Sequence, residues 1–202
     1  MSARDLPQPL PQLRLRGVDH TARPTWKLRE TIAFYRDKLG LPLVHAISAR
    51  GWGPADHADF LHFFFDSGNG STIAFFYYIG TERPEYLSTR DDYRYRATHT
   101  AWQVQKLEDL DVWRKHLIAA GIPLRYETRH EIIESLYFED PNGYSVEITC
   151  QLRPMTVVDA HDAELTMAAA IELEGKGAAF ANIDAVWRRK GALLEAEIGG
   201  RA

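Results

Sequence analysis

Hydrophobic positions along the chain change their period repeatedly between residues 14 and 151. In the stretches 28–39 and 107–120, apolar side chains recur every three or four residues, which predicts two amphipathic helices. A glycine follows each stretch, at Gly40 and Gly121, and is expected to end the helix. The apolar positions are Leu28, Ile32, Tyr35 and Leu39 in the first stretch and Leu107, Leu110, Trp113 and Leu117 in the second.

Short apolar or alternating runs follow each predicted helix and are typical of β-strands. They cover 41–47, 59–66 and 71–78 after the first helix, and 123–128, 134–140 and 144–150 after the second. The sequence DPNG at 140–143 separates the last two runs and predicts a hairpin turn. With a short strand at His20 and another at His99, each half is predicted to be a βαβββ unit.

The two halves also share residues, which indicates an internal repeat. His20-Thr21-Ala22 recurs as His99-Thr100-Ala101, and Asn69-Gly70 recurs as Asn142-Gly143. The matching positions lie in corresponding predicted elements. The chain is therefore predicted to contain two copies of one unit.

These patterns predict an α+β fold of paired βαβββ modules, with a helical extension at the C-terminal end. The predicted domain spans 14–151, with modules at about 14–80 and 95–151. Residues 1–13 contain three prolines and are expected to form an N-terminal arm. Residues 152–202 form the predicted extension, with helices at about 159–173 and 179–197. Residues 79–97 link the two modules, and the sequence predicts neither a structure nor a function for this link.

Composition narrows the function classes. The formal net charge is −4, without the excess of Lys and Arg typical of nucleic-acid-binding proteins. No apolar run approaches the roughly 18 residues of a membrane span, and the N-terminal stretch has no apolar core of signal-peptide length. We therefore expect a cytoplasmic protein that binds neither nucleic acid nor membranes. The single cysteine, Cys150, lies in an apolar run and is expected to pack in the core.

Three residues are candidate metal ligands. His20 and His99 open the two copies at matched positions, so a pseudo-twofold pairing of the copies is expected to bring them together. Glu147 lies among apolar neighbours in the last predicted strand, where a carboxylate needs a partner. Two imidazoles and one carboxylate form the facial triad that suits iron(II) or manganese. The alternative is that both histidines are structural core residues and Glu147 is a charge at the rim.

Paired βαβββ units with metal ligands on matched strands resemble the vicinal oxygen chelate superfamily over about 15–151. The resemblance implies a β-barrel-like sheet, and a homo-oligomer is expected. The superfamily includes glyoxalase I, fosfomycin-resistance transferases, bleomycin-binding proteins and type I extradiol ring-cleavage dioxygenases, so the fold does not decide the function. The repeat places Ala74 where Glu147 stands in the second copy. Alanine cannot bind a metal, which favours the members with three ligands.

The stretch from Thr128 to Glu147 is similar to the signature of extradiol dioxygenases. The resemblance implies that Glu147 binds the metal and that His130 and Tyr137 are catalytic residues beside it. It also implies iron(II) as the cofactor, with manganese(II) or another divalent ion as the alternative. The substrates would be a catechol-like aromatic compound and dioxygen. In this chemistry His130 would act on bound dioxygen and Tyr137 would orient the substrate. No residue is assigned to substrate binding.

One departure from the extradiol pattern leaves other functions open. Extradiol enzymes carry a histidine near the start of the last strand of the first copy, where this chain has Ser71, and His62 on the neighbouring strand is a possible substitute. A metal-dependent transferase or isomerase of the fosfomycin-resistance or glyoxalase type is a second interpretation. It predicts a cation-rich pocket, for which Lys106, Arg125 and Arg129 are candidates. A non-catalytic binder of small molecules is the third.

Overall fold

The computed structural model describes residues 17–50, 57–88, 92–176 and 182–200. The predicted arm at 1–13 lies outside the described residues. The chain divides into two compact units, one within Leu15–Arg153 and the other within Pro154–Ala202. The first unit contains both predicted modules, and the second contains the helical extension.

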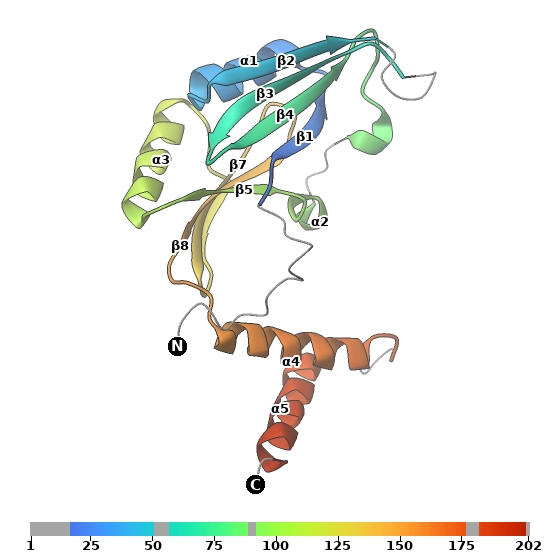
Figure 1. Cartoon of the computed structure of the whole chain (residues 1–202), viewed down its shortest axis with the longest axis vertical. Helices are drawn as coiled ribbons and strands as arrows, with labels where there is room; N and C mark the ends of the chain where they lie inside the picture. Colours follow the sequence, from blue (N-terminus) through green and yellow to red (C-terminus); the bar gives the residue numbers. More distant parts are fainter. Residues whose placement is uncertain (1–16, 51–56, 89–91, 177–181, 201–202) are drawn as a thin grey trace. The chain divides into compact units, whose positions relative to one another are not determined.

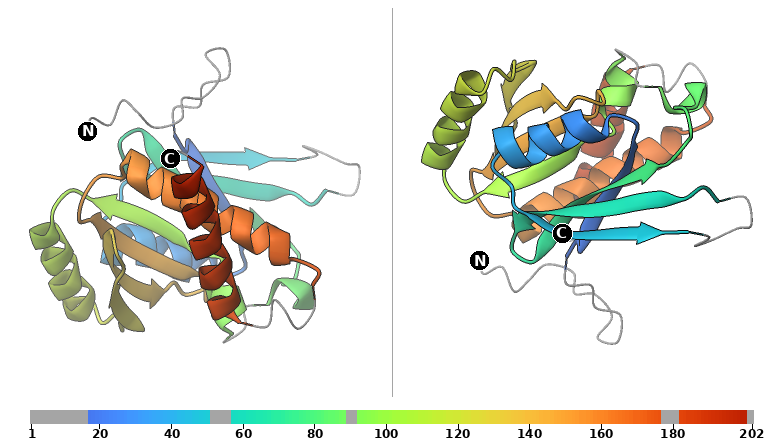
Figure 2. Two further views of the ribbon diagram at one scale, coloured as in Figure 1. Left: turned by 90° about the horizontal axis from the view of Figure 1, so that it is seen from below. Right: turned by 90° about the horizontal axis from the view of Figure 1, so that it is seen from above.

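Each module forms one four-stranded mixed sheet. The first has the strand order β1-β4-β3-β2 and the second the order β5-β8-β7-β6. The outer pairs β1–β4 and β5–β8 are parallel, and the other pairs are antiparallel. Figure 1 shows α1 beside the first sheet and α3 beside the second, and the two views of Figure 2 agree. The predicted α+β fold of paired βαβββ modules is therefore confirmed.

The elements occur in the predicted order, with bounds that differ by a few residues at most ends. In the first module they are β1 (His20–Thr25), α1 (Leu28–Ile32), η2 (Ala33–Lys38), β2 (Leu43–Ala49), β3 (Phe60–Gly68) and β4 (Ser71–Tyr78). In the second they are β5 (Thr100–Val104), α3 (Leu107–Ala119), β6 (Tyr126–Arg129), β7 (Ile133–Glu139) and β8 (Ser145–Gln151). The link contains two short turns of helix, η3 (Glu85–Leu87) and α2 (Tyr93–Arg96).

The strand register makes the internal repeat visible in three dimensions. Ala22 pairs with Ala74 across β1 and β4, and Ala101 pairs with Glu147 across β5 and β8. Phe64 lies opposite Ala74 in the first sheet, and Tyr137 lies opposite Glu147 in the second. Ala74 therefore occupies the position of Glu147, as the sequence repeat predicts.

The first helix differs from the prediction in its second half. Residues Ala33–Lys38 form a π-helix, in which the Leu39 backbone N–H donates to the Phe34 carbonyl at 2.9 Å. The π-helical turn is wider than an α-helical turn because each hydrogen bond spans five residues. The consecutive residues Phe34 and Tyr35 in this segment are both buried.

The two modules share one hydrophobic core. Tyr35 packs on Phe65 and Phe75 of the first sheet, with ring centroids 5.4 Å and 4.9 Å away, and its ring edge meets Trp102 of the second sheet. The same cluster continues through buried residues of α3, β7 and β8. The modules therefore meet through the faces of their sheets that carry the helices.

A buried polar cluster joins the β7–β8 turn to the first module. The Asp140 carboxylate accepts hydrogen bonds from the backbone N–H groups of Asn142 and Tyr144 and from the Tyr35 hydroxyl. Asn142 accepts from Thr25 at 2.7 Å and donates to Thr31 at 3.1 Å. Burial raises the pKa of Asp140, while these hydrogen bonds oppose that change. The cluster therefore fixes both the turn and the contact between the modules.

The extension within Pro154–Ala202 is a pair of helices, α4 (Val157–Leu173) and α5 (Ile183–Gly199), that pack on each other. Leu165, Ala169 and Val186 are buried in this unit. Within the described ranges, no helix has the length and apolar character needed to cross a membrane.

Replacing Asn142 with alanine should destabilise the domain. The change removes bonds to Thr25, Thr31 and Asp140, whose polar groups stay buried, so we expect a loss of about 2–3 kcal/mol in the free energy of unfolding. Urea denaturation measures the loss. Asn69→Gly is the matched control, because Asn69 holds the same place in the repeat but is exposed with a φ of 53°. An equal effect of both variants would contradict this role of the cluster.

Candidate metal site

His99, Tyr137 and Glu147 lie together on the second sheet, on the face away from the shared core. Side chains alternate along a strand, so His99 shares a face with Ala101, which pairs directly with Glu147. Tyr137 pairs with Glu147 from the other side. The strand register thus brings Tyr137 and Glu147 side by side, and His99, directly before β5, reaches Glu147 from the other side.

The His99 ring has defined partners at both nitrogens. Its Nδ1 lies 3.0 Å from the Arg96 carbonyl at the end of α2, and its Nε2 lies 2.8 Å from Glu147 Oε2. A carbonyl oxygen only accepts, so Nδ1 must carry a proton. In the neutral ring, the Nε2 lone pair then faces a carboxylate lone pair. Two facing lone pairs repel each other, so either a shared proton or a metal ion must lie between these atoms.

Glu147 has a second feature of a metal ligand. Its side chain is only 3% exposed, and its Oε1 is buried without a hydrogen-bond partner among the described residues. A buried carboxylate oxygen without a partner is energetically costly. The residues present therefore fit a bound cation, because coordination would satisfy Oε1 and neutralise the charge.

Tyr137 packs against both members of this pair. Its ring meets the His99 ring edge to face, with centroids 5.7 Å apart, and stacks on Tyr126 at 4.3 Å. Burial, and then the charge of Glu147 and a hydrogen bond with its side chain, raise the pKa of Tyr137 from 10.0 to about 12. The phenol therefore stays protonated at neutral pH. In this form it can donate one hydrogen bond and accept others through its oxygen lone pairs.

His20 lies on the first sheet and has different neighbours. Its Nδ1 is 2.7 Å from Asp19 Oδ1, and its ring packs against Phe64 and His62, with centroids 5.9 Å and 6.3 Å away. In the part of the chain that the structure describes, no three His, Cys, Asp or Glu side chains are placed to hold one metal ion. The expected meeting of His20 with His99 is therefore not found within a single chain.

The packing of the modules explains this result. Strands β1 and β5 approach each other through Arg23 and Thr100, whose side chains form a hydrogen bond of 2.8 Å. Because side chains alternate, these residues lie on the opposite faces of their strands from His20 and His99. The two histidine faces are thus turned away from the contact between the modules.

His130 is also not brought to the pair. It is exposed at the turn between β6 and β7, where its backbone N–H donates to the Ile133 carbonyl. Tyr137 lies four residues beyond Ile133 along β7, which corresponds to about 13 Å at the rise of an extended strand. The structure therefore places Tyr137, but not His130, beside the proposed ligands.

His62 shares the sheet face of His20 and lies on β3, which is separated from β1 by β4. Its Nδ1 lies 3.1 Å from the Phe75 carbonyl, and its ring stacks on Phe76 at 3.7 Å. The carbonyl again assigns the proton to Nδ1 and leaves Nε2 as an acceptor. Burial lowers the pKa of His62, which favours this neutral form.

Three neighbours of the candidate ligands are absent from the sequence-based assignment. Asp19 orients His20, Tyr126 supports Tyr137, and His45 packs against Phe64 with centroids 5.6 Å apart. Tyr126 and His45 occupy equivalent positions of the internal repeat. His45 lies opposite Phe64 in the first sheet just as Tyr126 lies opposite Tyr137 in the second, but this match depends on the strand register.

Comparisons of structure identify proteins with a similar fold. A glyoxylase/bleomycin resistance protein/dioxygenase domain from Frankia sp. EAN1pec is 22% identical with a TM-score of 0.50, covering 68% of this chain and 93% of its own. A lactoylglutathione lyase from Agrobacterium tumefaciens is 23% identical with a TM-score of 0.47, covering 68% and 95%. FosX from Listeria monocytogenes, a fosfomycin resistance protein complexed with Mn(II), is 18% identical with a TM-score of 0.46, covering 70% and 96%.

Sequence comparison decides the family. No curated protein matches the chain in a sequence search. The family model of the Glyoxalase/Bleomycin resistance protein/Dioxygenase superfamily matches residues 17–148, which include both candidate histidines, Glu147 and both sheets except the end of β8. The chain therefore belongs to the Glyoxalase/Bleomycin resistance protein/Dioxygenase superfamily.

Proposed function

We propose that this protein is a metal-dependent enzyme whose divalent ion is held by His99 and Glu147 of one copy and His20 of a second copy. We further propose that it is an extradiol-type dioxygenase, which cleaves a catechol-like aromatic ring with dioxygen at an iron(II) site. The observation that carries the metal proposal is the pair of facing acceptors, His99 Nε2 and Glu147 Oε2, beside an unpartnered Oε1.

The donor set suits such an ion. Histidines that bind metals usually give their other ring N–H to an oxygen acceptor, which orients the ring. His99 does so with the Arg96 carbonyl, and Asp19 offers His20 the same support. Two imidazoles and a carboxylate favour iron(II) or manganese(II) and leave coordination positions for substrates.

A second copy is required because of the way the modules pack. The face that carries His20 and the face that carries His99 point away from the contact between β1 and β5. In a twofold-symmetric dimer, the first sheet of one copy would meet the second sheet of the other. Two equivalent sites would then form, each with His20 from one chain and His99 with Glu147 from the other.

The residues around this site suit the cleavage of an aromatic diol. A bound iron(II) would supply a place for the diol and dioxygen to meet and would pass electrons between them. Both oxygen atoms would enter the product, and one carbon–carbon bond beside the diol would break. Tyr137 would remain protonated and donate a hydrogen bond to an oxygen of the substrate. His62 Nε2 would accept a hydrogen bond from a substrate hydroxyl.

The transferase interpretation receives less support from the surface charges. Arg125 forms an ion pair with Glu139 at 2.6 Å, and Arg129 lies 3.7 Å from Glu134. Lys106 sits at the start of α3. These side chains are distributed over separate elements and, for the two arginines, are compensated by carboxylates, so they do not gather into a site for an anionic substrate.

Oxygen consumption provides the test of the dioxygenase. Protein reconstituted anaerobically with iron(II) should consume oxygen when catechols are added and should produce a yellow ring-opened product, seen in the visible spectrum. Metal binding without oxygen uptake across the panel would contradict the dioxygenase proposal. Turnover of a thiol or an epoxide instead would identify a transferase or isomerase.

The metal ligands can be tested without turnover. His99→Ala and His20→Ala should each weaken metal binding by more than about a hundredfold, since losing a ligand costs more than losing a supporting residue. Calorimetry measures the affinity, and elemental analysis measures the metal retained. His161→Ala is the control, because this partly exposed histidine pairs with Glu197 in the extension. Undiminished metal retention in His99→Ala would refute the assignment.

Mixing the two ligand variants tests the shared site. In a dimer of His20→Ala and His99→Ala chains, one site would contain all three native ligands and the other would lack both histidines. Refolding the two variants together should therefore restore metal binding in the mixed dimers, at about one ion per two chains. Restoration is impossible if all ligands come from one chain, so a mixture that binds no metal would exclude the proposed arrangement.

A further inference from the structure

The helical extension carries an exposed stripe of large apolar side chains along α5. Four side chains form it, each between 41% and 65% exposed: Ile183, Trp187, Leu194 and Ile198. At 3.6 residues per turn, these positions fall within about 60° of the helix circumference. They therefore form one continuous ridge, which we call the α5 stripe. Exposed apolar side chains gathered in this way mark a surface that binds another protein.

Helix α4 packs on a different side of α5. Val186 is buried, and ion pairs of 2.5 Å join Arg189 to Glu172 and Lys190 to Asp162. On the helix circumference, Val186 and Arg189 lie outside the arc of the α5 stripe. The contact with α4 therefore leaves the stripe uncovered.

The two helices bury few apolar side chains between them. Among the described residues of this unit, the buried ones are Leu165, Ala169 and Val186. Units of about 40 residues or fewer seldom bury enough apolar surface to fold alone, and association with another chain is one way to complete their core. A further helix on the α5 stripe would supply the missing apolar contact.

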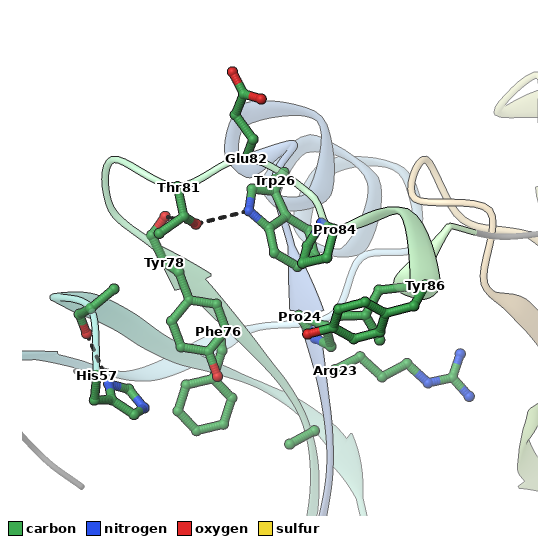
Figure 3. A pocket seen from close by; sticks show the side chains of 13 residues that line it. Arg23, Pro24, Trp26, His57, Phe76, Tyr78, Thr81, Glu82, Pro84 and Tyr86 are labelled. Carbon is green, nitrogen blue, oxygen red and sulfur yellow. Dashed lines mark hydrogen bonds between the residues drawn. The ribbon is translucent and has the colours of Figure 1, made fainter. Parts of the chain in front are cut away.

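The shape of the α5 stripe favours a helix as its partner over a small molecule. Elsewhere in the chain, aromatic side chains such as Trp26 and Tyr78 surround a hollow, as Figure 3 shows. Concave surfaces of that kind suit small ligands. The α5 stripe is instead a ridge on a convex helix surface, and such ridges pack into the grooves of another helix.

The spacing of the α5 stripe is the same in both directions along the helix. From Ile183, the next members follow at intervals of four, seven and four residues. In an antiparallel pair of identical helices, Ile183 of one chain would lie opposite Ile198 of the other. By the same symmetry, Trp187 would lie opposite Leu194. A twofold axis produces this kind of self-complementary contact.

The charges beside the α5 stripe favour the antiparallel arrangement. Arg188 and Glu195 lie on the same flank of the stripe, and neither has an ion-pair partner among the described residues. In the antiparallel pair, Arg188 of each chain would lie within about 3 Å, measured along the axis, of Glu195 of the other. At Gly191, near the middle, no described atom lies within 4 Å of the place of a Cβ, so the helices can approach closely there.

We propose that the α5 stripe binds the α5 stripe of a second copy, with the two helices antiparallel and the twofold axis near Gly191. This contact is separate from the contact between sheets that the proposed metal site needs, and it does not depend on the proposed function. It gives the extension a role in holding two chains together.

Crosslinking of the full chain tests the proposal. Ile183→Cys and Ile198→Cys chains that are refolded together and treated with a short bis-maleimide should form crosslinked dimers. Neither variant alone should crosslink, because two copies of the same position would lie about 22 Å apart. The native Cys150 is 2% exposed, so the unsubstituted chain is the control for its reaction.

A charge within the α5 stripe should weaken the contact. Leu194→Glu, introduced into both cysteine variants, should slow crosslinking at least about tenfold, because the twofold axis places the buried charge in the apolar contact twice. Ala192→Glu is the matched control, since Ala192 is exposed on the same helix but lies outside the stripe.

Exchanging the flanking charges tests the direction of the helices. Arg188→Glu should slow crosslinking, and adding Glu195→Arg to the same chain should restore it. These two residues are seven positions apart on one helix and do not contact each other there, so the restoration requires a second chain.

Three results would overturn the proposal. Rapid crosslinking of Ile183→Cys with itself would show a parallel or irregular contact. No crosslinking in the mixture would show that the stripe is covered by the chain's own domain or left in solvent. Equal effects of Leu194→Glu and Ala192→Glu would show that the stripe does not carry the contact. Because the assay needs neither metal nor oxygen, failure of the proposed enzyme chemistry would leave its outcome unaffected.

Discussion

The buried carboxylate of Asp140 determines much of the arrangement around it. Its hydrogen bonds to the backbone of Asn142 and Tyr144 close the β7–β8 turn, and the turn fixes the register that places Tyr137 opposite Glu147. Through Asn142, the same cluster reaches Thr25 and Thr31 of the first module. Burying these polar groups is favourable only because nearly all of them have partners. The geometry of the candidate site and the contact between the modules thus have a common origin.

In the proposed dimer, the second sheet would supply one half of the metal site and the first sheet the other half. On the second sheet, the Arg96 carbonyl directs the Nε2 lone pair of His99 toward Glu147. On the first sheet, Asp19 leaves Nε2 of His20 as the available donor. The repeat provides each histidine with the same place on its strand, but only the second copy has a carboxylate in place of Ala74. The two sheets therefore have the same backbone arrangement but different side chains at the candidate site.

Much of the fold could be predicted from the sequence because its signals are local. Periodicity located both modules, and the repeated residues gave the equivalence of Ala74 and Glu147 that the strand register confirms. The DPNG turn identified the hairpin in which Tyr137 pairs with Glu147, since a hairpin turn sets the register of its strands.

Other features depend on packing, which the sequence pattern does not encode. The π-helix at Ala33–Lys38, in which Phe34 and Tyr35 are both buried, is one such feature. The alternation of side chains along a strand places His20 and His99 on equivalent faces of their strands. It does not show through which faces the two modules pack. The similarity that suggested His130 is a match in spacing, and the short β6–β7 turn places that residue away from Glu147.

Pulsed electron paramagnetic resonance of the manganese(II)-loaded protein tests the central claim most directly, because it counts the imidazole nitrogens bound to the metal. The account predicts one ion per chain with two imidazoles in its coordination sphere. A single imidazole, or an ion surrounded only by oxygen ligands, would contradict a site shared by His20, His99 and Glu147.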